Sequence, residues 1–335
     1  MPPTTHVLAT HGNRFLLDGE PFEMWGLRLA NALEDDDHAE RLIAHLDEYV
    51  SYGISAFSVF LQGALTGSAN AFLADGSLDD AYMQRLARII EAADERRMVV
   101  NVGYLYQSRP APLDPLAQGI GLDQHTNEEI QWPRDVFQDG EALQAGVANA
   151  TAWLRDRGYA NVFVDLANEC NDERYRQTKP MYDLTRPDAM RDLILLAKAV
   201  YPGLLVGASV FDLWPLYRGV GDASDLILMH GLPARIKKQC MRHYRNKPQV
   251  ENESGNMLGC LDLYDAIGVF TPEQKAAFRL DAQEMSAAGE HWFLFTRWQQ
   301  LVPVHFDLGG DGTPEDPGVR WMFEFIRDLR KERAA

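Results

Sequence analysis

Residues 161–169 read NVFVDLANE, an apolar run that is interrupted by one aspartate and ends in Asn168-Glu169. Residues 247–255 read KPQVENESG and also place an Asn-Glu pair, Asn252-Glu253, at the end of a short run. Runs of this length and composition are typical of strands with both faces buried. A charged side chain at the end of such a strand is costly unless it is solvated or used. The two pairs therefore indicate where the chemistry of this chain lies.

Strand-like and helix-like segments alternate on both sides of these two runs. The expected strands are 23–29, 55–62, 99–106, 162–168, 204–210, 226–230, 248–253 and 292–298. The expected helices are 38–52, 79–96, 140–157, 187–200, 234–244, 272–288 and 318–331, with a short helical stretch after the fifth strand. Regular alternation of this kind predicts a parallel sheet. Eight units predict an α/β fold of the (β/α)8 TIM barrel type.

The first 22 residues predict a β-hairpin in front of the barrel, because turns at Gly12-Asn13 and Asp18-Gly19 separate short apolar runs. A Rossmann-like sheet is the alternative architecture. It requires a GxGxxG turn after the first strand, where residues 26–31 read GLRLAN. With no Pro/Ser/Gly-rich linker in the chain, we expect residues 1–335 to form a single catalytic domain, with the hairpin in residues 1–22.

The composition excludes some classes of partner. Asp and Glu number 49 against 32 Lys and Arg, which gives a formal net charge of −17. Such a charge argues against a binder of nucleic acid or of an anionic membrane. Three widely spaced cysteines and the absence of an apolar leader predict a cytoplasmic protein with reduced thiols, or a secreted one if a leader has been removed. Oligomeric state is left open.

Strands four and seven lie on opposite sides of an eight-stranded barrel, so their C-terminal ends face each other across the mouth. Two glutamates about 5 Å apart suit retaining glycoside hydrolysis, whereas about 6.5–9.5 Å suits inversion. Strand seven offers two candidates, Glu251 and Glu253. We prefer Glu253, because two residues of strand rise bring it roughly 6–7 Å closer to the mouth.

The sequence resembles the clan A glycoside hydrolases, and in layout the cellulase-like family 5 group. The matching residues are RFLLDGEPF at 14–22, Asn168-Glu169, Glu253, and Trp298 near the end of strand eight. The resemblance implies a retaining β-glycoside hydrolase acting on a neutral oligosaccharide or β-glycoside. It implies that Glu169 is the acid/base, that Glu253 is the nucleophile and that Asn168 binds the sugar 2-hydroxyl. A carbohydrate is then the expected partner, and the chemistry needs no metal or organic cofactor.

Further side chains at the expected strand ends are candidates for substrate binding. Arg28 and His230 are expected near the nucleophile, with a structural ion pair and a packed rim histidine as the alternatives. Four aromatic residues are candidate sugar platforms or core residues, namely Trp298, Tyr104, Tyr106 and Trp25. The aspartates 35–37 predict a helix N-terminus.

Two other functions fit a barrel. A metal-dependent TIM-barrel hydrolase needs a cluster of His and Asp at strand ends, where His230 stands alone in the sequence pattern. A barrel that binds carbohydrate without catalysis needs the same mouth but tolerates loss of one carboxylate. The long polar segments 107–139 and 303–317 are expected to shape the mouth in each case.

Overall fold

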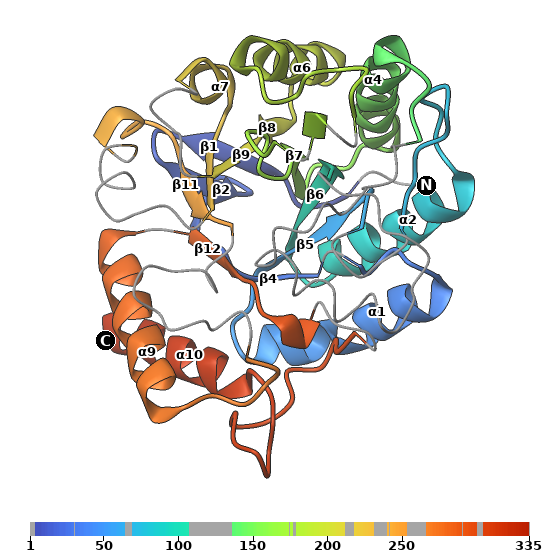
Figure 1. Ribbon diagram of the computed structural model, residues 1–335. Helices are drawn as coiled ribbons and strands as arrows, with labels where there is room; N and C mark the ends of the chain where they lie inside the picture. Colours follow the sequence, from blue (N-terminus) through green and yellow to red (C-terminus); the bar gives the residue numbers. More distant parts are fainter. Residues whose placement is uncertain are drawn as a thin grey trace.

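The computed structural model describes residues 4–29, 31–63, 69–106, 136–173, 175–176, 179–211, 218–230, 240, 242–252, 266–289, 291–299 and 304–334. Parallel strands form a barrel in its centre, and helices surround the barrel on the outside (Figure 1). The expected (β/α)8 barrel with a small N-terminal sheet is confirmed. Within the described residues, no helix combines the length and apolar character needed to cross a membrane.

The barrel strands run in the order β8-β7-β6-β5-β4-β12-β11-β10-β9. Their bounds are β4 (Trp25–Arg28), β5 (Ala56–Phe60), β6 (Val99–Leu105), β7 (Val162–Ala167), β8 (Leu205–Gly207), β9 (Ser209–Phe211), β10 (Ile227–His230), β11 (Gln249–Glu251) and β12 (His291–Leu294). Since β8 and β9 are separated by one residue, they act as one barrel strand. The first half pairs with β7 and the second with β10, which closes the ring.

The seven helices of the described residues agree closely with the sequence pattern, whereas most of the expected helix 234–244 lies outside the described residues. Their bounds are α1 (Asp36–Ser51), α2 (Asp80–Asp94), α4 (Gly140–Arg157), α6 (Pro187–Val200), α7 (Arg218–Ala223), α9 (Pro272–Ala288) and α10 (Arg320–Ala334). On α1, Leu42 and Leu46 are buried as expected, but Val50 is 46% exposed and Tyr49 is buried in its place. Two steps of four residues rotate by about 80° beyond two full helical turns, so the third position leaves the buried face.

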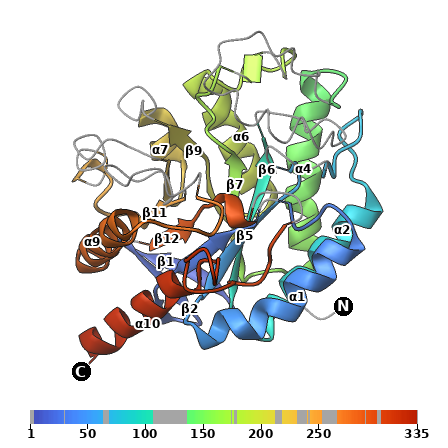
Figure 2. The same ribbon diagram turned by 60° about the horizontal axis from the view of Figure 1, so that its bottom comes forward.

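The N-terminal residues form three antiparallel strands, β1 (Leu8–His11), β2 (Arg14–Leu17) and β3 (Glu20–Phe22). This sheet contains the expected hairpin and adds one strand to it. Figure 2 shows it at one end of the barrel. Phe15 is fully buried there, 4.8 Å from the ring of His291 and 6.3 Å from that of Phe163. The sheet therefore closes the N-terminal end of the barrel and leaves the C-terminal end for the site.

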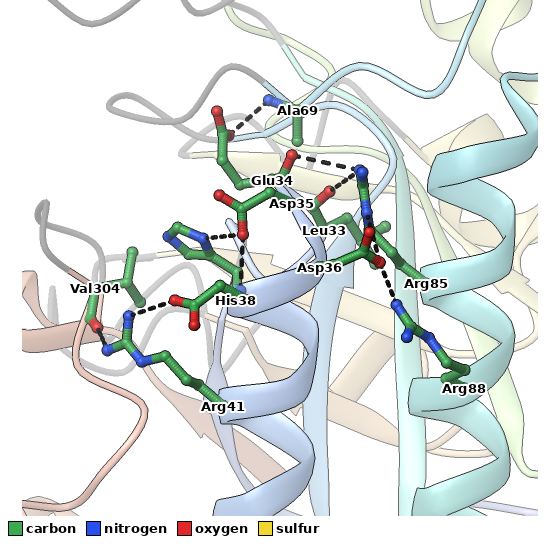
Figure 3. A network of polar contacts seen from close by, with 11 residues as sticks. Leu33, Glu34, Asp35, Asp36, His38, Arg41, Ala69, Arg85, Arg88 and Val304 are labelled. Carbon is green, nitrogen blue, oxygen red and sulfur yellow. Dashed lines mark hydrogen bonds and ion pairs between the residues drawn. The ribbon is translucent and has the colours of Figure 1, made fainter.

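The aspartates 35–37 form the N-terminus of α1, as expected (Figure 3). Asp35 is the N-cap and accepts a hydrogen bond of 2.8 Å from the backbone N–H of His38. Arg85 of α2 approaches Asp36 at 3.5 Å, and Arg88 forms a closer ion pair with the same carboxylate. Asp35, Asp37 and His38 are also close enough to share an ion, but they lie at the surface and cap the helix.

The end of the eighth barrel strand differs from the sequence expectation. Strand β12 ends at Leu294, and Trp298 lies in a short 3-10 helix, η3 (Arg297–Gln299). Within that turn, the Thr296 hydroxyl donates to the side chain of Gln299 at 2.5 Å. A side chain–side chain hydrogen bond spanning three residues suits a helical turn and not an extended strand.

We predict that Gly103→Ala destabilises the barrel, because a Cβ at this interior position of β6 would come within 2.1 Å of the Phe60 ring. Overpacking of this kind costs about 1–3 kcal/mol of unfolding free energy. Gly219→Ala on α7 is the matched control, because its Cβ would meet no atom within 4 Å. Urea denaturation of both variants measures the difference. Equal stability of Gly103→Ala and the wild type would contradict the close packing of the interior.

Candidate active site

The chain turns sharply at the end of β7, where Asn168 and Glu169 lie. Glu169 has a φ of 48°, in the left-handed region that residues other than glycine seldom adopt. Its backbone N–H donates to the Ser209 hydroxyl at 3.0 Å, and the next residue, Cys170, donates to the Ser209 carbonyl at 2.8 Å. Strained backbone held in this way is concentrated at functional sites.

Arg28 and Asn168, predicted separately from the sequence, are in direct contact. Both side chains are fully buried, and the guanidinium of Arg28 donates to Asn168 Oδ1. The same guanidinium lies over two aromatic rings, 4.6 Å from the centroid of Phe60 and 5.0 Å from that of Phe295. Cation–π contacts in a desolvated site hold the cation firmly. Arg28 therefore orients the amide of Asn168.

His230 joins this group from the end of β10. It is fully buried, and its Nδ1 lies 3.5 Å from Glu169 Oε1, while the Glu169 side chain is 15% exposed. Four predicted residues, namely Arg28, Asn168, Glu169 and His230, thus meet where β4, β7 and β10 end. A carboxylate reachable from solvent beside a buried imidazole and an oriented amide suits proton transfer to a bound substrate.

A polar layer that the sequence analysis missed lies directly beneath this group. Asp165 of β7 is fully buried and accepts hydrogen bonds from Asn252 Nδ2 at 2.9 Å and from the Ser209 N–H and hydroxyl at 3.0 Å each. Burial raises the pKa of the Asp165 carboxyl to about 6, although the charges of His230 and Arg28 act to lower it. The sequence did contain a signal, because Asp165 is the one carboxylate inside an otherwise apolar run.

The seventh barrel strand, β11, shows which way Glu251, the second candidate for the nucleophile, faces. Glu253 lies outside the described residues. Glu251 is 2% exposed and is paired in register with Trp292, whose ring contacts Phe278 of α9. Its neighbour Asn252 faces the barrel interior. Glu251 therefore faces the helices, away from the layer that contains Asp165. The sequence expectation that Glu251 and Glu253 point to the same side concerns a residue outside the described part of the chain, and it stays a prediction.

Solved structures resemble this barrel along nearly its whole length. An endo-1,4-β-mannanase from Rhizomucor miehei superposes with a TM-score of 0.61 at 14% identity, covering 98% of this chain and 99% of its own. A glycoside hydrolase family 5 mannosidase from the same organism gives 0.59 at 12% identity, over 98% and 99%. A β-glucanase from Saccharophagus degradans gives 0.57 at 12% identity, over 99% and 95%. The chain therefore shares the barrel fold of these three enzymes.

At identities of 12–14% the likeness concerns the fold alone. No protein-family model matches the chain, and a comparison with curated protein sequences finds no match. Evidence for a function therefore comes from the chemistry of the residues at the barrel mouth. The aromatic candidates of the barrel can be assessed in the same way, from what each ring contacts.

Tyr106 lies near the charged group, and Tyr104 and Trp25 do not. Tyr106 is 3% exposed and packs edge-on against Phe60 at 5.8 Å, beside Arg28. Tyr104 is fully buried, and its hydroxyl is 3.2 Å from Thr151 of α4. Trp25 packs edge-on against Trp292 at 5.1 Å. Of the two alternatives that the sequence left open for Tyr104 and Trp25, core residue or sugar platform, their contacts favour the core, because strand alternation turns both side chains toward the helices.

Trp298 is also more enclosed than the sequence suggested. It is 8% exposed, and His305 stacks on its ring at 3.9 Å. A Cβ on Gly268 or Gly309 would come within 2.4 Å or 2.7 Å of the indole, and both glycines have positive φ. The indole nitrogen donates to the Asp307 carbonyl at 3.1 Å. Of the two alternatives that the sequence left open for Trp298, these contacts favour a packed residue.

We predict that Trp298→Ala mainly lowers stability, because the substitution removes a nearly buried indole. Loss of such a side chain costs about 3–5 kcal/mol of unfolding free energy. Trp153→Ala is the control, because Trp153 on α4 is only partly buried and its loss should cost less. Thermal unfolding compares the two variants. An unchanged melting temperature together with weakened sugar binding would instead support a platform role for Trp298.

Proposed function

We propose that this protein is a retaining β-glycoside hydrolase that acts on a neutral oligosaccharide or β-glycoside. The observation that carries the proposal is the position of Glu169, a solvent-reachable carboxylate on strained backbone next to Asn168 and His230. The barrel is similar in fold to a mannanase, a mannosidase and a β-glucanase. One structure of that mannosidase, a mutant form, is a complex with mannosyl-fructose. These relatives support a carbohydrate substrate.

The mechanism is double displacement. The Glu169 carboxyl protonates the glycosidic oxygen while the Glu253 carboxylate attacks the anomeric carbon, which releases the leaving alcohol and forms a glycosyl ester on Glu253. Glu169, now a carboxylate, then removes a proton from water as the water attacks the same carbon. The ester bond breaks, Glu253 is regenerated, and the two inversions give net retention.

The neighbouring residues assist this reaction. Arg28 donates to the oxygen of the Asn168 amide, so the opposite, N–H end of that amide is the donor for the sugar 2-hydroxyl. Such a contact strengthens as the transition state develops. The imidazole of His230, 3.5 Å from Glu169 Oε1, holds the acid/base in orientation. Both contacts are preorganised, because Arg28, Asn168 and His230 are fully buried.

The direct test is a panel of aryl β-glycosides, including mannosides and glucosides, with the products followed by NMR. We expect the β-anomer to form first and to convert slowly to the equilibrium mixture. A first product of α configuration would exclude the retaining mechanism. Saturable sugar binding without any turnover would favour the non-catalytic carbohydrate-binding barrel.

We predict that Glu169→Ala and Glu253→Ala each lower kcat by at least about 100-fold on an active substrate, because general acid–base and nucleophilic steps contribute about 10²–10⁴-fold. Glu173→Ala is the control. It lies four residues beyond Glu169 and is well exposed, and it pairs only with Arg176 among the ion pairs of the described residues. The wild-type rate is expected for this control. If both active-site variants turn over like the wild type, the assignment is wrong.

A further inference from the structure

Asp165 is a carboxylate with no access to solvent, placed in the barrel interior on β7, four residues before Glu169. Its partners come from two other barrel strands. Ser209 of β9 donates both its N–H and its hydroxyl, and Asn252, just beyond β11, donates its amide. Burying a carboxylate is costly even when it is hydrogen-bonded. Its presence at this position therefore calls for a reason beyond packing.

Each partner of Asp165 leads to one of the two proposed catalytic residues. The Ser209 hydroxyl that donates to Asp165 also accepts the backbone N–H of Glu169, at 3.0 Å. Asn252 precedes Glu253 directly, and its N–H donates to the Met229 carbonyl at 2.8 Å. Asn101 of β6 completes the layer by donating to Asn252 Oδ1 at 3.4 Å. One buried side chain thus connects the backbones that carry the acid/base and the nucleophile.

We propose that Asp165 is a positioning residue for the glycosidase reaction, which fixes Glu169 through Ser209 and the approach to Glu253 through Asn252. The inference rests on the proposed function and extends it to a residue that touches no substrate. A deviation of about 1 Å in a reacting group costs roughly 100-fold in rate. Hydrogen bonds that fix the backbone at Glu169 and at Asn252 therefore contribute to the rate without touching the substrate.

The charges around Asp165 support this role. Arg28 from β4 and His230 from β10 are the cationic groups that stabilise its ionised form. Burial raises the pKa of Cys170 and of Tyr175 far above neutral, and the charge of Asp165 raises both further, so these two groups stay uncharged. Burial raises the pKa of Asp165 itself to about 6, above its ordinary value of 3.8. The folded state therefore loses stability as the pH rises from about 4 to about 6, because the unfolded chain releases that proton first.

The test is Asp165→Asn, which keeps the shape and removes the charge. We expect kcat on an aryl glycoside to fall at least about ten-fold at pH 7.5, with KM within about three-fold of the wild type. The acid limb of the kcat profile, which includes ionisation of Asp165 near pH 6, should flatten. The melting temperature of the variant minus that of the wild type should be larger at pH 7.5 than at pH 4, because the variant lacks the carboxyl that destabilises the wild type as it ionises. Loss of activity without loss of stability at pH 7.5 distinguishes positioning from simple structural support.

Asp94→Asn is the matched control, because Asp94 on α2 is also buried and also accepts three hydrogen bonds, from Thr5 and His6. We expect it to lower the melting temperature and to leave kcat unchanged. Ser209→Ala tests the link to Glu169. Its loss of kcat/KM should be smaller on a 2,4-dinitrophenyl glycoside than on a 4-methylphenyl glycoside, because the former leaving group needs no protonation.

Three results would overturn the inference while the proposed function stands. They are a kcat of Asp165→Asn within two-fold of the wild type, a parallel loss of kcat and melting temperature at pH 7.5, and an equal effect of Ser209→Ala on both leaving groups. A wild-type protein that hydrolyses no glycoside would instead overturn the proposed function, and this inference with it. The two failures are therefore distinguishable.

Discussion

The guanidinium of Arg28 is a permanent positive charge inside the barrel, and much of the site is arranged around it. The rings of Phe60 and Phe295 lie against it. The amide oxygen of Asn168 accepts its hydrogen bond, and Asp165 supplies an opposing charge. A buried cation is stable only when its solvation is replaced in this way. The consequence is a preorganised mouth, because the hydrogen bond from Arg28 fixes the amide of Asn168 beside Glu169.

The barrel interior is divided into two halves of opposite character. Its N-terminal half is apolar and is closed by the sheet β1–β3, with Phe15 packed against Phe163 and His291. Its C-terminal half contains Asp165, Asn101, Ser209 and Asn252, hydrogen-bonded to one another. The apolar half supplies the hydrophobic stabilisation, and the polar half supplies directional contacts in a medium of low dielectric. The same strands therefore carry apolar side chains in the N-terminal half of the barrel and polar side chains a few residues later.

Much of the fold follows from local patterns. The bounds of α4, α6 and α9 agree with the expected helices at both ends. Each helix has a start signal in the sequence, which is an aspartate before α4 and a proline at the first position of α6 and α9, and glycine follows α4 and α9. What the sequence left open for the aromatic residues was their orientation. Tyr104 and Trp25 are aromatic, as sugar platforms are. The adjacent inward positions belong to Gly103 and Gly26, where the rings of Phe60 and Phe293 leave no room for a side chain. Strand alternation then turns both aromatics outward.

The amino-acid pattern was enough to predict an eight-unit barrel and to place Arg28, Asn168, Glu169 and His230 at the ends of its strands. These follow from periodicity and from the cost of burying charge, which are local properties. Only the folded chain reveals that Asp165 connects β7, β9 and the end of β11, that Glu251 faces the helices, and that Trp298 is enclosed. The physical reason is that burial and hydrogen-bond partners depend on residues far apart in the sequence. No local pattern specifies which side chains will share the interior of a closed sheet.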